Sequence, residues 1–159
     1  MNSTKNPKSI IEQLNRKKWW HSPPLDKCAY KKRGAFLASS YKECEFYGRP
    51  YDNPIEVHLS NPLIDTEENI IKRLFGSDSR QMDTYRSLLD IFSKTTLNTR
   101  FRLDAEIYKA AKKKGYDSIA IVTAAGMKKV EEKQLPRSIE LNVFDINKSS
   151  LKEVKNASL

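Results

Sequence analysis

The sequence has few of the residues that hold metal ions. Its 159 residues include only two cysteines, Cys28 and Cys44, and two histidines, His21 and His58. The cysteines form no Cys-x-x-Cys pair and match no spacing typical of zinc ligands. We therefore expect no bound metal, and nothing in the spacing indicates a disulfide bond.

Long apolar runs are also absent. No stretch is long enough to cross a bilayer, and the first residues do not resemble a secretory signal peptide. We therefore expect a soluble protein with no membrane partner, working in the reducing environment of a cytoplasm.

Positive charge exceeds negative charge. There are 29 Lys and Arg against 20 Asp and Glu, a formal net charge of +9. Such a balance attracts polyanions, so nucleic acid, an acidic protein and a phosphate-bearing cofactor all stay open. Many lysines fall on outer helix faces, which favours a solvated surface over a dedicated nucleic-acid groove.

The length suits one domain with a substantial core. We divide the chain into an N-terminal extension with a helix at 1–17, a single domain at 18–150 and a C-terminal tail at 151–159. Apolar residues at helical spacing predict helices at 10–14, 70–75, 82–92 and 103–111, and a serine cap with Gly48 at the end predicts one at 41–47. Short apolar or alternating runs predict strands at 19–21, 35–38, 55–63 with a break at Asn61-Pro62, 118–122 and 139–144. The charged segment 25–33 is expected to be irregular.

Three short segments carry chemistry. Trp19-Trp20-His21-Ser22-Pro23 puts a histidine at a strand end, because Pro23-Pro24 stops the strand. Gly34 opens an apolar strand that ends at Ser39-Ser40, where a serine oxygen can cap the helix that leads to Tyr47. Glu140 alternates with two apolar neighbours, so it is expected to leave the core and face a cleft.

The order of these segments resembles the ADP-ribosyltransferase superfamily over most of the chain. Two later pieces add to the resemblance: Gly115-Tyr116-Asp117 before a buried strand, and Glu140-Leu141-Asn142-Val143-Phe144-Asp145. The sequence looks most like the small phage-borne and polyvalent-protein members, a group that includes phage anti-CRISPR proteins. Ser138 stands where arginine-modifying relatives carry Glu, which argues against a standard arginine-directed enzyme.

The resemblance implies a fold and a site. The fold is α+β, a split β-sandwich of two small, facing, mainly antiparallel sheets with surrounding helices, and NAD binds in the cleft between the sheets. In the diphtheria-toxin-like branch the catalytic signature is His, Tyr and Glu, which His21, Tyr47 and Glu140 resemble. The expected NAD contacts are His21, Ser22, Phe36, Ser39 and Tyr47. Phe36 stands where that branch has a second stacking Tyr.

The residue types suit cleavage of the bond between nicotinamide and ribose. That step creates an oxocarbenium-like centre, and a nearby carboxylate such as Glu140 stabilises charge that appears only in the transition state. His21 can hydrogen-bond the hydroxyls of the adenosine ribose, and Tyr47 offers a flat face to the nicotinamide ring. Taken singly, each residue also fits a structural role in the core or at the surface.

The expected function is transfer of ADP-ribose from NAD, without a metal, to a macromolecular acceptor. The acceptor would be a host protein or a protein–nucleic acid complex, such as a CRISPR effector in the host cytoplasm if a phage carries the gene, and direct nucleic-acid contact is compatible with the charge. Two alternatives stay open. One is a catalytically silent member of the fold that binds or inhibits a partner, and the other is a basic nucleic-acid-binding protein without NAD chemistry.

Overall fold

The computed structural model describes residues 9–26, 28–90, 92 and 96–145. The helices are α1 (Ile10–Arg16), α2 (Ala29–Arg33), α3 (Tyr41–Cys44), α4 (Glu67–Phe75), α5 (Arg80–Leu89), α6 (Leu97–Lys113) and α7 (Ala124–Glu131), with a 3-10 turn η1 (Glu45–Tyr47). The strands are β1 (Trp20–His21), β2 (Ala35–Ala38), β3 (Pro62–Asp65), β4 (Ser118–Ile121) and β5 (Glu140–Val143). This mixture confirms the α+β class. In the described part of the chain, no helix is both long and apolar enough to span a membrane.

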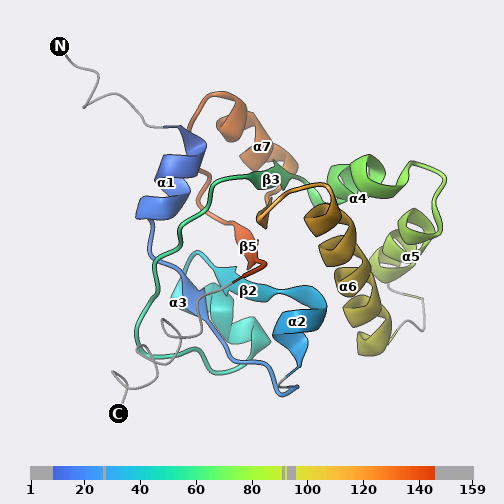
Figure 1. The fold of residues 1–159 in the computed structure, drawn as a ribbon, viewed down its shortest axis with the longest axis horizontal. Helices are drawn as coiled ribbons and strands as arrows, with labels where there is room; N and C mark the ends of the chain where they lie inside the picture. Colours follow the sequence, from blue (N-terminus) through green and yellow to red (C-terminus); the bar gives the residue numbers. More distant parts are fainter. Residues whose placement is uncertain (1–8, 27, 91, 93–95, 146–159) are drawn as a thin grey trace.

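One five-stranded sheet, in the order β1-β2-β5-β4-β3, forms the middle of the protein. Neighbouring strands run antiparallel except for β3 and β4, which are parallel. A parallel pair needs a long crossover, and α4, α5 and α6 supply it. Figure 1 shows these three helices gathered on one side of the molecule and α1 on the opposite side, with the strands between them.

Each face of the sheet packs against its own apolar core. One core joins Leu37 and Leu141 of the sheet to α1, to Trp19 and to the segment 55–59. The other joins Leu63 and Ile119 to α4, α5 and α6. Because both faces are covered, β2 and β4 read as nearly continuous apolar runs. The central strand β5 alternates instead, with Glu140 and Asn142 on one face and Leu141 and Val143 on the other.

The expectation of two facing sheets is not met, because the described residues form a single sheet. The sequence predicts a half-buried strand over 55–63. Ile55, Val57 and Leu59 are buried and the residues between them are exposed, as the alternation predicts. Ile55 forms an isolated bridge to Trp19, and at the other end of the segment Pro62 and Leu63 belong to β3 and pair with β4. Residues 55–59 therefore pack their apolar side chains on the sheet face without forming a ladder.

Two further boundaries differ from the prediction. Asn61-Pro62 was expected to break a strand, but Pro62 begins β3, since the first residue of an edge strand does not need its amide hydrogen. The segment 25–33 was expected to be irregular, but residues 29–33 form α2. Its Arg33 stacks over the ring of Phe101 in α6 at 3.8 Å, so tertiary contact stabilises a short helix that its own sequence does not indicate.

The N-terminal helix belongs to the body of the protein. Leu14 of α1 is fully buried, and the indole N–H of Trp19 donates to its carbonyl oxygen at 3.0 Å. The part of 1–17 that is described therefore packs into the core. Residues 1–8 and the predicted tail 151–159 lie outside the described residues.

Candidate functional site

Glu140 is the first residue of β5, a strand in the centre of the sheet. It pairs with Ala38 of β2 on one side and with Ile121 of β4 on the other. Leu141, which follows it, is fully buried, whereas Glu140 is half-buried. The prediction that Glu140 leaves the core agrees with this position, because its side chain lines a pocket.

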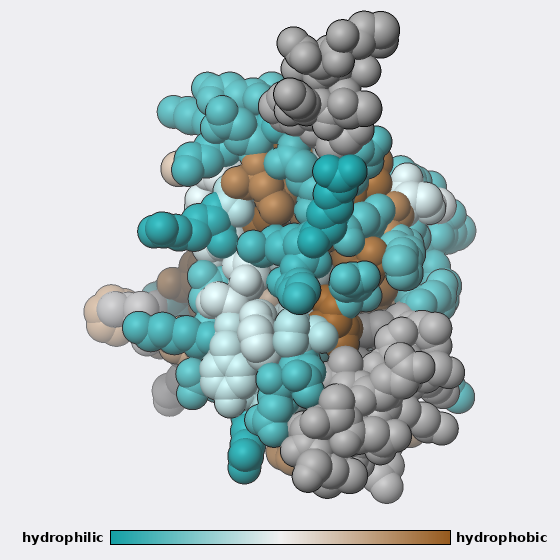
Figure 2. All heavy atoms as spheres, turned by 90° about the vertical axis from the view of Figure 1, so that its left-hand side faces the viewer, coloured by the Kyte–Doolittle hydropathy of each residue, from teal (hydrophilic) through white to brown (hydrophobic). Residues whose placement is uncertain are grey.

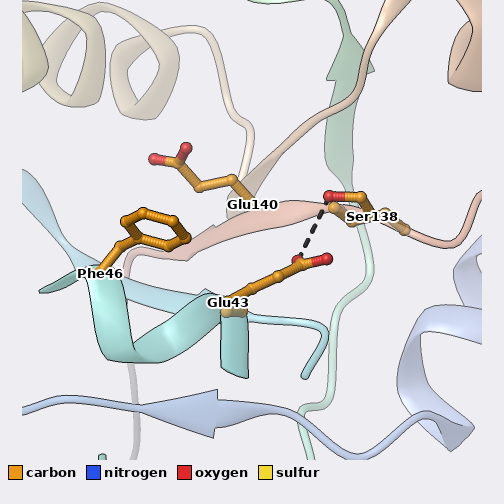
Figure 3. A pocket seen from close by; sticks show the side chains of 6 residues that line it. Glu43, Phe46, Ser138 and Glu140 are labelled. Atoms are coloured by element: carbon orange, nitrogen blue, oxygen red, sulfur yellow. Dashed lines mark hydrogen bonds between the residues drawn. The ribbon is translucent and has the colours of Figure 1, made fainter. Parts of the chain in front are cut away.

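The pocket has a volume of about 290 Å³ and opens to solvent at this end of the sheet. Its lining residues are Ala38, Glu43, Phe46, Ser138, Ile139 and Glu140. In Figure 3 the side chain of Glu140 extends above the ring of Phe46, while Glu43 reaches the other way, toward Ser138. Two carboxylates and one aromatic ring thus share a small, partly polar hollow.

The helix beside the pocket begins as the sequence predicts. Ser40 precedes α3, and its hydroxyl oxygen accepts a hydrogen bond from the amide of Glu43 at 3.1 Å. Ser40 and Glu43 have the spacing of a capping box, in which the glutamate would turn back to the serine amide. Instead, the carboxylate of Glu43 accepts from the hydroxyls of Ser39 and Ser138, at 3.0 and 3.2 Å.

Ser39 therefore has a different place from the one expected. Its hydroxyl lies within 3.0 Å of Glu43 Oε2 and 3.1 Å of the Arg137 carbonyl, and it accepts from the amide of Ile139 at 3.3 Å. These contacts join the end of β2 to the start of β5. Ser39 borders the pocket through its partners and is not among the pocket's lining residues.

The aromatic residue at the pocket is Phe46, which the sequence analysis did not single out. The predicted helix 41–47 is α-helical only to Cys44 and continues as the tighter turn η1. A change from 3.6 to about 3 residues per turn alters which side chains face a neighbour. Phe46 is 90% exposed and lines the pocket. The side chain of Tyr47, the predicted stacking residue, lies outside the described residues.

His21 is buried, with 3% of its surface exposed, and both ring nitrogens have partners. Its Nδ1 lies 2.8 Å from the Phe36 carbonyl oxygen, and its Nε2 lies 2.8 Å from the Tyr30 hydroxyl. A carbonyl only accepts, so Nδ1 carries the proton and Nε2 accepts from Tyr30. Burial lowers the pKa of His21 below its ordinary 6.5. Burial also raises the pKa of Tyr30 to about 12, with a further contribution from Tyr51.

The strand register places His21 and Glu140 on opposite faces of the sheet. His21 pairs with Leu37, and Leu37 pairs with Leu141, so these three side chains share one face. Glu140 precedes Leu141 and points to the other face. The expectation that His21 and Glu140 line one groove is therefore not met, because the alternation of a β-strand separates them.

The other two predicted NAD contacts are Phe36 and Ser22. Phe36 lies on the sheet face that carries the pocket, whereas Ser22 lies in the interior. Phe36 lies two residues before Ala38 on β2 and so shares the face of Glu140, at partial exposure. Ser22 is buried, and its hydroxyl lies 3.1 to 3.2 Å from the carbonyl oxygens of Cys44 and Gly48. Phe36 therefore stays near the pocket, and Ser22 secures the turn after α3.

Within the described residues there is no group of three or more His, Cys, Asp and Glu side chains that could hold a metal ion. Comparison of the chain with protein-family models, with curated proteins and with solved structures finds no match. The functional argument therefore rests on the residues of the pocket and on their chemistry.

Proposed function

We propose that the protein transfers ADP-ribose from NAD to a macromolecular acceptor, with Glu140 as the carboxylate beside the reacting ribose. The observation that supports this most is the pocket in which Glu140 lies next to an exposed aromatic ring. A volume of about 290 Å³ suits one end of a dinucleotide, the nicotinamide and its ribose. The resemblance of the motif order to ADP-ribosyltransferases supports the same substrate.

In this mechanism the bond between ribose C1′ and the nicotinamide nitrogen breaks, and its electron pair leaves with the nicotinamide. The positive charge that develops on the ribose is stabilised by the Glu140 carboxylate. Phe46 offers a flat apolar face to the departing ring, in the role that we predicted for Tyr47. An acceptor nucleophile then bonds to C1′ and gives up its proton, and no metal takes part.

Labelled NAD tests the proposal. Purified protein is incubated with NAD labelled in the adenosine half and with bacterial lysate, and transfer to macromolecules is followed on gels. We expect Glu140→Gln to lower the transfer rate by about 100-fold or more, because the amide carries no charge to stabilise the transition state. Glu56→Gln, the same change at an exposed site away from the pocket, is expected to leave the rate unchanged. Equal label with wild type and Glu140→Gln would refute the role of Glu140.

A second candidate is a catalytically silent protein that binds or inhibits a partner. The internal hydrogen bonds of His21 favour it, because they engage both ring nitrogens of this predicted catalytic residue with Phe36 and Tyr30 instead of with a ligand. Under this alternative, wild type releases no nicotinamide with any lysate. Calorimetry with NAD then separates a binding module, which gives a heat of binding, from a protein that does not take NAD at all.

A further inference from the structure

The backbone ladder of the sheet stops at Glu140. Ala38 and Glu140 form the last pair between β2 and β5, and beyond them the chain enters the turn to α3 on one side and the segment 137–139 on the other. Glu140 pairs with both neighbouring strands, but no ladder pair precedes it along β5, and strand ends fray more easily than strand centres. The position of Glu140 therefore depends in part on what holds the residues just before it.

The side chains of Ser39 and Glu43 hold the segment 137–139 in place. Ser39 accepts from the Ile139 amide and contacts the Arg137 carbonyl, and Glu43 accepts from the Ser138 hydroxyl. Ser39 and Glu43 are themselves joined at 3.0 Å. Ser138 and Ile139 thus each have a hydrogen bond to Glu43 or Ser39, which lie about 100 positions earlier in the chain, and the Arg137 carbonyl shares the single proton of the Ser39 hydroxyl with Glu43. We call Ser39 and Glu43 the clasp.

We propose that the clasp is a positioning device for Glu140, and that Glu43 acts by accepting hydrogen bonds rather than by its charge. The inference rests on the proposed function, since positioning matters only if Glu140 acts on a bound ribose. Both hydroxyls approach the same carboxylate oxygen, Oε2, and Figure 3 shows Glu43 directed at Ser138 and away from Glu140. A neutral amide oxygen can accept the same two bonds.

The kinetic test compares Glu43→Ala with Glu43→Gln. We expect Glu43→Ala to lower kcat for NAD cleavage by about tenfold, because a small displacement of a catalytic group is costly, while KM for NAD changes less than kcat. Glu43→Gln is expected to recover most of the lost kcat, since its amide oxygen takes the place of Oε2. Glu45→Ala, at an exposed glutamate of η1 outside the pocket, serves as the control.

Two outcomes would overturn the inference. Wild-type kcat in Glu43→Ala would show that the clasp does not position Glu140. A loss in Glu43→Gln as large as in Glu43→Ala would show that the charge of Glu43 acts directly. Urea unfolding of each variant separates these results from a general loss of stability.

Amide exchange tests the clasp without any activity. The Ile139 amide donates to Ser39 Oγ, so Ser39→Ala is expected to speed its hydrogen exchange by about tenfold, while the Leu141 amide in the strand interior is unchanged. Ser39→Thr, which keeps the hydroxyl, is expected to restore the protection. If wild type does not cleave NAD, the proposed function is refuted, but faster exchange at Ile139 in Ser39→Ala would still show that the clasp holds this segment. Unchanged exchange at Ile139 in Ser39→Ala would contradict the clasp itself.

Discussion

At the scale of single residues, Gly34 occupies a position where any side chain would cause strain and a close contact. It has a φ of +77°, and a Cβ built on it would lie 2.0 Å from Asn142 Oδ1 and 3.2 Å from the Val143 carbonyl oxygen. Asn142 cannot retreat easily, because it is 4% exposed and its amide nitrogen donates to the Arg33 carbonyl at 2.9 Å. Its Oδ1 is buried without a hydrogen-bond partner in the described structure, pressed against Gly34.

Gly34→Ala is therefore expected to destabilise the protein by about 3 kcal/mol, from backbone strain and overpacking together. Urea unfolding measures the loss. Gly76→Ala is the matched control, since Gly76 also has a positive φ, of +102°, but nothing lies within 4 Å of its Cβ position. The control isolates the strain and is expected to cost about 1 kcal/mol. Equal losses in the two variants would contradict the role of the Asn142 contact.

The sequence predicted single residues well where one neighbour along the chain decides the outcome. The capping bond of Ser40 and the outward position of Glu140 follow from local spacing and strand alternation. The place of His21 depends on which strands become neighbours and in which register. A one-residue shift would put it on the face of Glu140, and no sequence pattern sets that shift.

At the scale of elements, an ion-pair cluster joins α4 to α6. Arg100 of α6 pairs with Glu67 of α4, and with Asp104 one turn later at 2.8 Å. Burial raises the pKa of Asp104 to about 6 from its ordinary 3.8, against the attraction of Arg100. A raised pKa means that the folded state favours the neutral acid. The stability contributed by this group is therefore complete below pH 3.8 and is lost as the pH rises through about 6.

Asp104→Asn removes this titration. Wild type loses stability as the pH rises and the variant does not, so the free energy of unfolding of Asp104→Asn is expected to increase relative to that of wild type, by about 2 kcal/mol between about pH 4 and about pH 7. Urea unfolding of both proteins across that range measures the difference. His21, whose pKa is lowered, has the opposite sign and costs stability as the pH falls below 6.5, but it is present in both proteins and cancels. A difference that does not vary with pH would contradict the raised pKa of Asp104.

The elements that the sequence predicted are those with a long or regular apolar pattern. Strands β2, β4 and β5 and helices α4, α5 and α6 all lie where periodicity indicated them. Helix α2 and the start of β3 were missed because tertiary contacts stabilise them, α2 against α6 and β3 beside β4. The segment 55–59 has the alternation of a strand because its apolar side chains pack on the core, and packing alone does not require a ladder.

At the scale of the whole molecule, the net charge of +9 predicts weak, salt-dependent attraction to polyanions. We expect the protein to be retained on immobilised heparin at low salt and to elute as the salt concentration rises. The double change Lys113→Gln and Lys114→Gln, at two exposed lysines where α6 ends, is expected to lower the salt needed for elution. Glu140→Gln is expected not to lower it. Flow-through of wild type at low salt would contradict this account of the charge.

The two edges of the sheet have a consequence for how the protein behaves at high concentration. On the β1 side, the outward backbone groups of Trp19 are already bonded to Ile55, and the His21 carbonyl is bonded to the Tyr51 amide at 2.9 Å. On the β3 side, the strand begins with Pro62, which has no amide hydrogen to offer. A second copy of the chain therefore meets backbone groups that are already bonded along the β1 edge, and at the β3 edge it finds no amide hydrogen at Pro62. Both features oppose edge-to-edge pairing of two copies.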